Sequence, residues 1–211
     1  MLKEIASRII APTLKGMKEE GNPFKGVLYV GLMMTKDGPF VLEYNVRFGD
    51  PETQSLLPRL RSDLVGLMTA SCKGRLGWWS RPRWDERPCV CVVMSAGGYP
   101  GAYETGKEIT GLGALKNQKD VVVFHSGTRK TDGKIVSAGG RVLGVTALGQ
   151  NIPEARENTY QAVQKIHFER CFFREDIGQR ILEEDARRKE EAEKQALLEA
   201  YLKQEALKED S

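Results

Sequence analysis

The chain has 211 residues, of which 40% are hydrophobic and 29% charged, a composition typical of a globular protein with a sizeable core. No apolar run approaches the roughly 20 residues that cross a bilayer, and no apolar secretory segment opens the chain, so we expect a cytoplasmic protein with no membrane partner. The net charge of +3 combines a basic body with an acidic tail; such a body suits phosphorylated substrates, and without a basic stripe interleaved with aromatic residues we expect no nucleic-acid partner.

An amphipathic helix is predicted over residues 3 to about 20. Ile5, Ile9 and Ile10 recur at helical spacing, with Lys and Glu between them. Pro12 lies inside the pattern, so we expect a kink or break there, and Gly21-Asn22-Pro23 should end the helix. Because an independent domain rarely opens on a helix with no preceding strand, we expect that the chain is cut from something longer.

Two strands joined by a turn should follow this helix. Residues 26–34 form an apolar run of strand length, and residues 35–39 have the composition of a turn, with Asp37-Gly38 as the hairpin signal. Residues 40–46 form the returning strand. The first strand is apolar on both faces and should be buried within a sheet, whereas the second is apolar on one face only.

Polar residues alternate along the second strand. Glu43, Asn45 and Arg47 are two residues apart, so their side chains should share one face of the strand. A carboxylate, an amide oxygen and a guanidinium suit a magnesium ion and the phosphate it carries, although a solvated strand face can have the same spacing. Asp50 and Glu52 follow on a Gly-Asp-Pro turn, placed to reach the same side of the sheet.

Two helices and a connector should complete the first half of the chain. Pro51 is expected in the first turn of a helix, where its missing N–H costs nothing. Ser62-Asp63 should cap a second helix that runs to about Lys73. Residues 74–88 have the composition of a connector with three tryptophans, which either pin it against the core or form a patch that faces a ligand or partner.

The composition changes at residue 89 to short strands and turns, which predicts a second, small α+β domain. We expect strands at residues 89–94, 121–125, 134–136, 141–146 and 171–173, a hairpin turn at 131–133 and a helix from 153 to about 166. The four cysteines show no CxxC spacing, and Cys89 and Cys91 alternate with valines. Buried free thiols in a reducing cytoplasm fit this pattern.

The tail, residues 180–210, consists almost entirely of strong helix formers. Residues 176–211 hold 7 basic and 11 acidic side chains, against 25 and 18 in the 175 residues before them. The apolar residues of the tail keep no clean heptad. It is therefore either a solvated single helix or a coiled-coil or partner-binding helix.

The run Arg47-Phe48-Gly49-Asp50-Pro51-Glu52-Thr53-Gln54 resembles the signature R-F-G-D-P-E-x-Q of the glycinamide ribonucleotide synthetases, or phosphoribosylamine–glycine ligases. These are ATP-grasp enzymes of purine biosynthesis. The resemblance also covers residues 26–33 and 41–46, and later residues 98–101, 108–111, 124–128 and 139–143. It ends near residue 177, and the tail has no counterpart that we recognise.

The resemblance implies an α+β fold in four parts. Residues 1–76 would be the carboxy-terminal part, or later subdomain, of an ATP-grasp domain, and 77–88 a linker rich in Trp, Pro and Arg. Residues 89–177 would form a small β-rich carboxy-terminal α+β domain, and 178–211 a charged helical tail. The amino-terminal domain and the lid of such an enzyme would precede Met1, and no other glycine-rich phosphate loop replaces them.

The resemblance also implies a reaction. The carboxylate of glycine attacks the γ-phosphate of ATP to give glycyl phosphate, and the amine of phosphoribosylamine then displaces phosphate. Glu43 and Asn45 match the ligands of the Mg²⁺, or Mn²⁺, that bridges the nucleotide phosphates. Arg47 matches the arginine that stabilises the transferring group, and Asp50 and Glu52 match a turn that faces glycine and phosphoribosylamine. Which of these two carboxylates meets which amine is left open.

Further residues follow from the same resemblance. Gly139, Gly140 and Arg141 match a glycine-rich turn on the ribose-phosphate side, although a surface ion pair explains Arg141 equally well. His125 lies in a strand-to-turn pattern and is interpreted as a structural histidine.

We expect this chain alone to bind ATP weakly or not at all and to lack ligase activity, whether it is a natural fragment, an expression product or half of a split enzyme. Its partner would be the missing amino-terminal half or a protein that binds the tail. Two other functions stay open: another ATP-grasp carboxylate–amine ligase, and a non-catalytic binding module.

Overall fold

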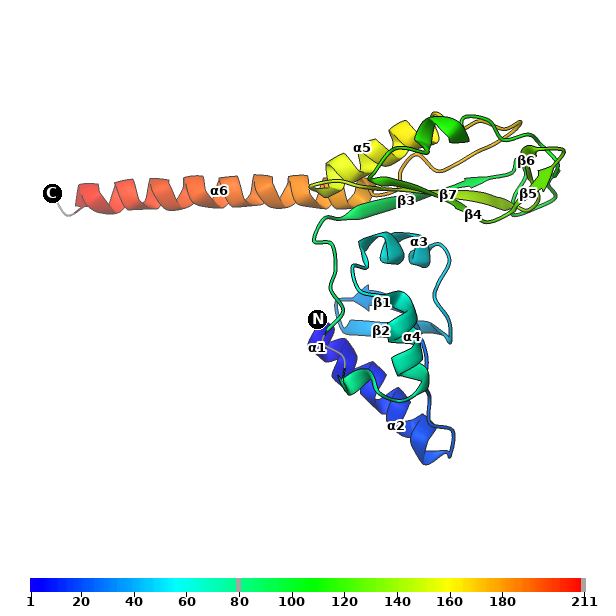
Figure 1. Ribbon diagram of the computed structural model, residues 1–211. Coiled ribbons are helices and arrows are strands. Elements are labelled where there is room, and N and C mark those ends of the chain that lie inside the picture. Colours follow the sequence, from blue (N-terminus) through cyan, green and yellow to red (C-terminus); the bar gives the residue numbers. More distant parts are fainter. Residues whose placement is uncertain (79–80, 210–211) are drawn as a thin grey trace. The chain divides into compact units, whose positions relative to one another are not determined.

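The computed structural model describes residues 1–78 and 81–209, which divide into two compact units with the boundary between Glu86 and Arg87 (Figure 1). Both units mix helices and strands. Within the described residues, no helix is long and apolar enough to cross a membrane. Trp79, one of the three tryptophans of the predicted connector, lies outside the described residues.

The first unit opens on a helical segment in three parts. The short helix α1 (Leu2–Ile5) leads into a π-helical stretch, Ala6–Ile10, and then into α2 (Ala11–Glu19). Pro12 has no N–H to donate to a carbonyl one turn earlier, and the wider π winding before it keeps the helix continuous. The irregularity predicted at Pro12 is therefore a change of winding and not a break.

A β-hairpin follows, formed by β1 (Tyr29–Thr35) and β2 (Gly38–Asn45). The strands are antiparallel and paired from Thr35 with Gly38 at the turn to Tyr29 with Asn45 at the open end, which confirms the predicted hairpin. Leu42 is an extra residue in the ladder, because Gly31 pairs with Glu43 and the next residue pairs with Val41. This bulge shifts the pairing by one residue.

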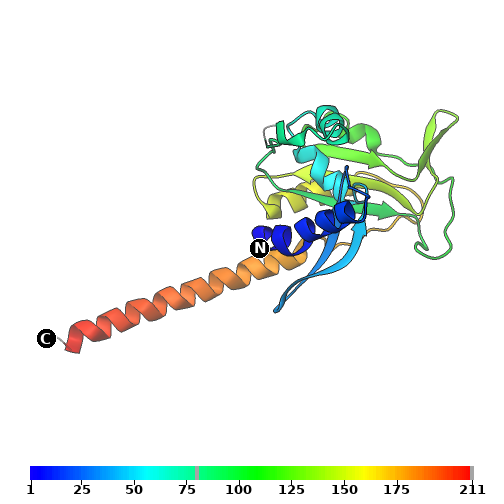
Figure 2. The same cartoon turned by 90° about the horizontal axis from the view of Figure 1, so that it is seen from below.

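The helical segment lies beside the hairpin (Figure 2). The hydroxyls of Thr13 on α2 and Tyr44 on β2 are 2.9 Å apart and share a hydrogen bond. The prediction that the first strand is buried on both faces is wrong. The side chain of Met33 on β1 is 51% exposed. The partner strand is also open to solvent: Leu42 on β2 is 63% exposed, and Val46, which follows β2, is 73% exposed. In the part of the chain that the structure describes, the sheet has only two strands, so neither strand has neighbours on both edges.

Two short α-helices complete the first unit, together with two 3-10 helices at Leu57–Arg59 and Leu76–Trp78. Pro51 is the residue that precedes α3 (Glu52–Leu56), one position earlier than we expected, and it follows a cis peptide bond from Asp50. The helix α4 (Leu64–Cys72) begins after Asp63, whose carboxylate accepts a hydrogen bond of 2.7 Å from the backbone N–H of Gly66. This confirms the predicted cap. Trp84 pairs with Leu60 through a single β-bridge.

The second unit is built on a three-stranded antiparallel sheet. Its order is β3 (Cys89–Ser95), β7 (Arg141–Leu148), β4 (Val121–His125), and α5 (Ile152–Val163) covers one face (Figure 1). The residues of α5 that recur at helical spacing are buried against alternate residues of β3: Ala155, Thr159, Ala162 and Val163 against Val90, Val92 and Met94. The main hydrophobic cluster of the chain lies here.

A hairpin and two helices also belong to this unit. A second hairpin joins β5 (Thr128–Thr131) to β6 (Lys134–Ser137), with Asp132 and Gly133 both left-handed at φ of +50° and +79°. A 3-10 helix covers Leu112–Leu115, and the helix α6 covers Gln179–Glu209. The short strand predicted at residues 171–173 is absent from the described residues, because only a single bridge joins Phe172 to Ser95.

The structure describes all four cysteines and joins none of them in a disulfide, but the prediction of buried thiols at Cys89 and Cys91 is only partly right. Cys89, Cys91 and Cys171 are half-buried, and Cys72 is exposed. Cys89 and Cys91 alternate with the residues that face α5, so they lie on the other face of the sheet. Cys72 is the last residue of α4.

Candidate functional site

The polar residues of β2 lie close together in the first unit. The side-chain N–H of Asn45 donates a 3.1 Å hydrogen bond to Oε1 of Glu43, so the two side chains are on the same side of the strand. Glu43 is exposed and Asn45 half-buried. Among the described residues, no three His, Cys, Asp or Glu side chains converge as metal ligands. A carboxylate beside an amide nevertheless fits Mg²⁺, which takes one or two protein oxygens and completes its shell with water and phosphate.

Tyr29 belongs to this group, although the sequence did not single it out. It pairs with Asn45 across the hairpin, and its hydroxyl donates a 3.1 Å hydrogen bond to Oε1 of Glu52. This hydrogen bond raises the pKa of Tyr29, burial and the charges of Glu52 and Glu43 raise it further, and the charge of Arg47 opposes them. Tyr29 thus lies within electrostatic reach of three of the predicted site residues.

Gly31 and Gly49 have no side chain, and the side chains of Glu43 and Glu52 occupy the space that a Cβ at these positions would take. A Cβ on Gly31 would lie 2.9 Å from Cγ of Glu43, its partner in the ladder. A Cβ on Gly49 would lie 2.9 Å from Cδ of Glu52 and would also collide with Oε2. Neither glycine has a positive φ, so space and not backbone freedom is what these positions require.

Arg47 and Asp50 make local hydrogen bonds beside this group. Nη1 of Arg47 donates to the carbonyl of Phe48 at 2.9 Å, and its side chain is exposed. Oδ1 of Asp50 accepts a 2.7 Å hydrogen bond from the side chain of Gln54 on α3. The structure therefore joins Glu43 to Asn45 and Glu52 to Tyr29, and gives Asp50 a partner on α3.

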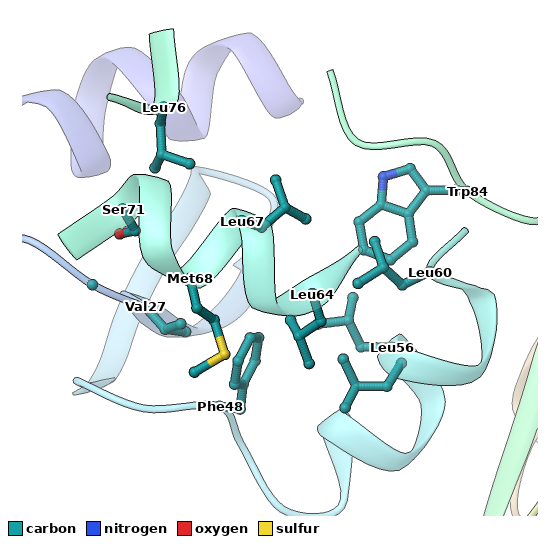
Figure 3. A pocket seen from close by; sticks show the side chains of 12 residues that line it. Val27, Phe48, Leu56, Leu60, Leu64, Leu67, Met68, Ser71, Leu76 and Trp84 are labelled. Carbon is teal, nitrogen blue, oxygen red and sulfur yellow. The ribbon is translucent and has the colours of Figure 1, made fainter. Parts of the chain in front are cut away.

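An apolar pocket of about 280 Å³ anchors the turn that carries these residues. Phe48 follows Arg47 directly and points into the pocket toward Met68 of α4 (Figure 3). The lining is almost entirely apolar and comes mainly from α3, α4 and their connections: Gly26, Val27, Phe48, Leu56, Leu57, Leu60, Leu64, Leu67, Met68, Ser71, Leu76 and Trp84. The half-buried Phe48 side chain packs against the apolar lining and so helps to hold the backbone between Arg47 and Gly49.

The predicted glycine-rich turn lies in the second unit, and close packing explains its glycines. A Cβ on Gly127 would lie 2.7 Å from Cα of Gly139, and a Cβ on Gly140 would lie 2.7 Å from Cε2 of Tyr99. Arg141 begins β7 and its side chain is exposed.

His125 ends β4 in an exposed position. Its Nδ1 is 3.0 Å from the hydroxyl of Thr128, within hydrogen-bonding distance. This is a local contact at the end of a strand, of the kind that the structural interpretation of His125 requires.

Two family models match the chain. The model described as "Phosphoribosylglycinamide synthetase, ATP-grasp (A) domain" matches residues 1–53, which include Tyr29, Glu43 and Glu52. The model described as "Phosphoribosylglycinamide synthetase, C domain" matches residues 89–180. The chain belongs to the phosphoribosylglycinamide synthetase family. Its mixed α/β fold is accordingly that of the A and C domains of this family.

Curated members of this family are similar over most of the chain. The phosphoribosylamine–glycine ligase of Escherichia coli (strain K12) is 50% identical over 180 residues, 84% of this chain and 42% of the relative. That of Rhodopirellula baltica is 48% identical over 181 residues, 86% and 41% respectively. The crystal structure of the Thermotoga maritima ligase matches with a TM-score of 0.72 and 38% identity, and covers 84% of this chain and 43% of that one. The chain thus spans about two fifths of the length of the relatives it matches.

Proposed function

We propose that the hairpin and the turn after it form the metal and substrate side of a phosphoribosylamine–glycine ligase site. The reaction joins glycine to 5-phosphoribosylamine at the expense of ATP and gives glycinamide ribonucleotide through glycyl phosphate. The observation that carries the proposal is the pairing of Glu43 with Asn45 and of Glu52 with Tyr29 at one end of the hairpin. Relatives of this chain are phosphoribosylamine–glycine ligases, which supports the choice of the two substrates.

Each residue has a role in this proposal. Glu43 and Asn45 hold a magnesium or manganese ion, which when bound neutralises charge on the nucleotide phosphates. The exposed guanidinium of Arg47 stabilises negative charge on the transferred phosphoryl group or the acyl phosphate. Asp50 and Glu52 attract the amines of glycine and phosphoribosylamine.

The second unit has a smaller part in the proposal. Gly139, Gly140 and Arg141 contribute to the ribose-phosphate side, since an exposed arginine after a tightly packed glycine turn presents a cation from a rigid backbone. Cysteines that form no disulfide among the described residues favour action in a reducing cytoplasm.

The 211-residue chain by itself would be inactive in this proposal. It supplies about two fifths of the length of the ligases it resembles, and its sequence contains no G-x-x-x-x-G-K-[ST] loop for ATP phosphates. Turnover then requires the rest of an ATP-grasp ligase, joined to this chain or supplied by a partner polypeptide.

A hybrid ligase tests the proposed function. In this hybrid, the 180 residues of the Escherichia coli (strain K12) relative that match are replaced by the matching residues of this chain. We expect formation of glycinamide ribonucleotide that depends on ATP, glycine and phosphoribosylamine. A folded hybrid that forms no product, under conditions where the unaltered relative does, would contradict the proposal.

A further inference from the structure

The carboxylate of Glu52 is fixed from two sides, although its side chain is exposed. Oε1 accepts the hydroxyl proton of Tyr29 at 3.1 Å, and Oε2 lies where a side chain on Gly49 would be. The backbone is fixed as well, because the N–H of Thr53 donates to the carbonyl of Gly49 at 3.0 Å. Twenty-three positions separate the tyrosine from the glutamate, so this contact joins the start of β1 to the start of α3.

We infer that Tyr29 is a positioning residue, which with Gly49 holds the Glu52 carboxylate in the orientation that meets a substrate amine. The inference rests on the proposed function and assigns to Tyr29 a role that follows from the hydrogen bond alone. Of the two carboxylates that the proposed function gives to the amines, it concerns Glu52, because Tyr29 donates to Glu52 whereas Asp50 accepts from Gln54.

A glutamate at the start of a short helix would otherwise sample several rotamers. Binding an amine then includes the entropy cost of selecting one of them, and a hydrogen bond already present in the free protein removes much of that cost. The bond engages one carboxylate oxygen and each oxygen has two lone pairs, so the carboxylate can still accept hydrogen bonds from an ammonium group. Tyr29→Phe would keep the aromatic ring and lose only this hydrogen bond.

The chain offers a matched control in Tyr44. It lies on β2 in the same hairpin and is about half exposed, and its hydroxyl shares a hydrogen bond with Thr13 on α2 instead of a site carboxylate. Tyr44→Phe therefore removes the same atom from the same hairpin and leaves Glu52 untouched.

The first measurement uses the 211-residue chain. NMR couplings and nuclear Overhauser contacts of the Glu52 side chain report whether it keeps one rotamer near ring 29. We expect one rotamer in the unaltered chain and in Tyr44→Phe, and averaged rotamers in Tyr29→Phe. Averaged rotamers in the unaltered chain would overturn the inference.

The second measurement uses the hybrid ligase. We expect Tyr29→Phe to raise KM for glycine or for phosphoribosylamine about tenfold, the usual effect of losing one hydrogen bond to a charged group. KM for ATP should stay unchanged, whereas a variant that only loosened the fold would lower the amount of active enzyme and leave each KM as it was. Tyr44→Phe should change no KM.

Gly49→Ala gives an independent check, because it displaces the far end of the same carboxylate from the other side. It should raise the same KM as Tyr29→Phe. An active hybrid in which Tyr29→Phe and Gly49→Ala leave both amine-substrate KM values unchanged would overturn the inference and leave the proposed function standing. A folded but inactive hybrid would overturn both.

Discussion

Gly31 faces Glu43 across the hairpin so closely that a methyl group would occupy the place of the glutamate side chain. Gly31→Ala should therefore rotate Glu43 away from Asn45 while the backbone stays in place. We expect the activity of the hybrid ligase to fall at least ~10-fold, on the order of the cost of misplacing a metal ligand or its support. Steady-state kinetics of the hybrid measure this change.

Gly16→Ala is the control for this substitution. It lies in the same unit, on α2, where nothing is within 4 Å of the added methyl group. Alanine should stabilise the helix there by roughly 0.5–1 kcal/mol and leave activity unchanged. Equal activity of the Gly31→Ala and Gly16→Ala hybrids would contradict the role given to Gly31.

For individual residues, the sequence predicted which polar side chains belong to the candidate site but not all the contacts that they make. The alternation of Glu43 and Asn45 places them on one face because strand geometry has a period of two. Tyr29 could not be found in the same way. Counting from the turn pairs it with residue 44, and only the bulge at Leu42 moves its partner to Asn45. Bulges depend on local packing that the sequence does not reveal.

The helix α5 begins with two hydrogen bonds from backbone N–H groups to side chains. The side chain of Asn151 accepts from the N–H of Glu154 at 2.9 Å, and the Glu154 carboxylate accepts from the N–H of Gln150 at 2.8 Å. Asn151→Ala should therefore destabilise the second unit by about 1 kcal/mol, the usual cost of removing a cap. Asn151→Asp, which keeps an acceptor, should restore most of this stability.

Urea unfolding of the chain, followed by circular dichroism, measures both Asn151 variants. The midpoint should fall for Asn151→Ala and return toward the original value for Asn151→Asp. Equal midpoints for the two variants would show that the cap does not contribute to stability.

Helices, strands and turns could be predicted where the residues typical of the element are also the residues that it buries or the residues that its backbone requires. The strands β3, β4 and β7 are apolar runs in a packed sheet, and the turn at Asp132-Gly133 has the residues that a left-handed pair requires. The strand β5 was missed because its Thr-Arg-Lys-Thr sequence has no apolar alternation. Burial of β1 was wrongly predicted because burial depends on neighbouring strands, which a single stretch of sequence does not specify.

The whole chain allows a prediction about nucleotide binding. Isothermal titration of the 211-residue chain with ATP and Mg²⁺ should show no micromolar binding. Glu43 and Asn45 offer two protein ligands to the ion, and the sequence has no G-x-x-x-x-G-K-[ST] loop to hold the phosphates of ATP. Micromolar affinity of the isolated chain would contradict the claim that it needs the rest of a ligase.

For the molecule as a whole, similarity to known sequences identified the family. Composition and charge indicated only a globular protein that suits phosphorylated substrates. The run from Arg47 to Gln54 was informative because it crowds a guanidinium and two carboxylates into one turn, and the structure shows how Phe48 and Gly49 hold that turn. The packing role of Gly139 and Gly140 needed coordinates, because a glycine in sequence does not show which atoms approach it.

Glu43→Gln in the hybrid ligase tests the central claim most directly. The substitution keeps the shape of the side chain and removes the charge that a magnesium ion requires. Glu19→Gln is the control, since Glu19 is exposed on α2 with an ion pair to Lys15 at 3.6 Å. We predict that Glu43→Gln lowers the rate of glycinamide ribonucleotide formation at least ~100-fold, because metal charge stabilisation is worth several kcal/mol, and that Glu19→Gln leaves it unchanged. A Glu43→Gln hybrid as active as the Glu19→Gln hybrid would contradict the assignment of this hairpin as the metal side of the site.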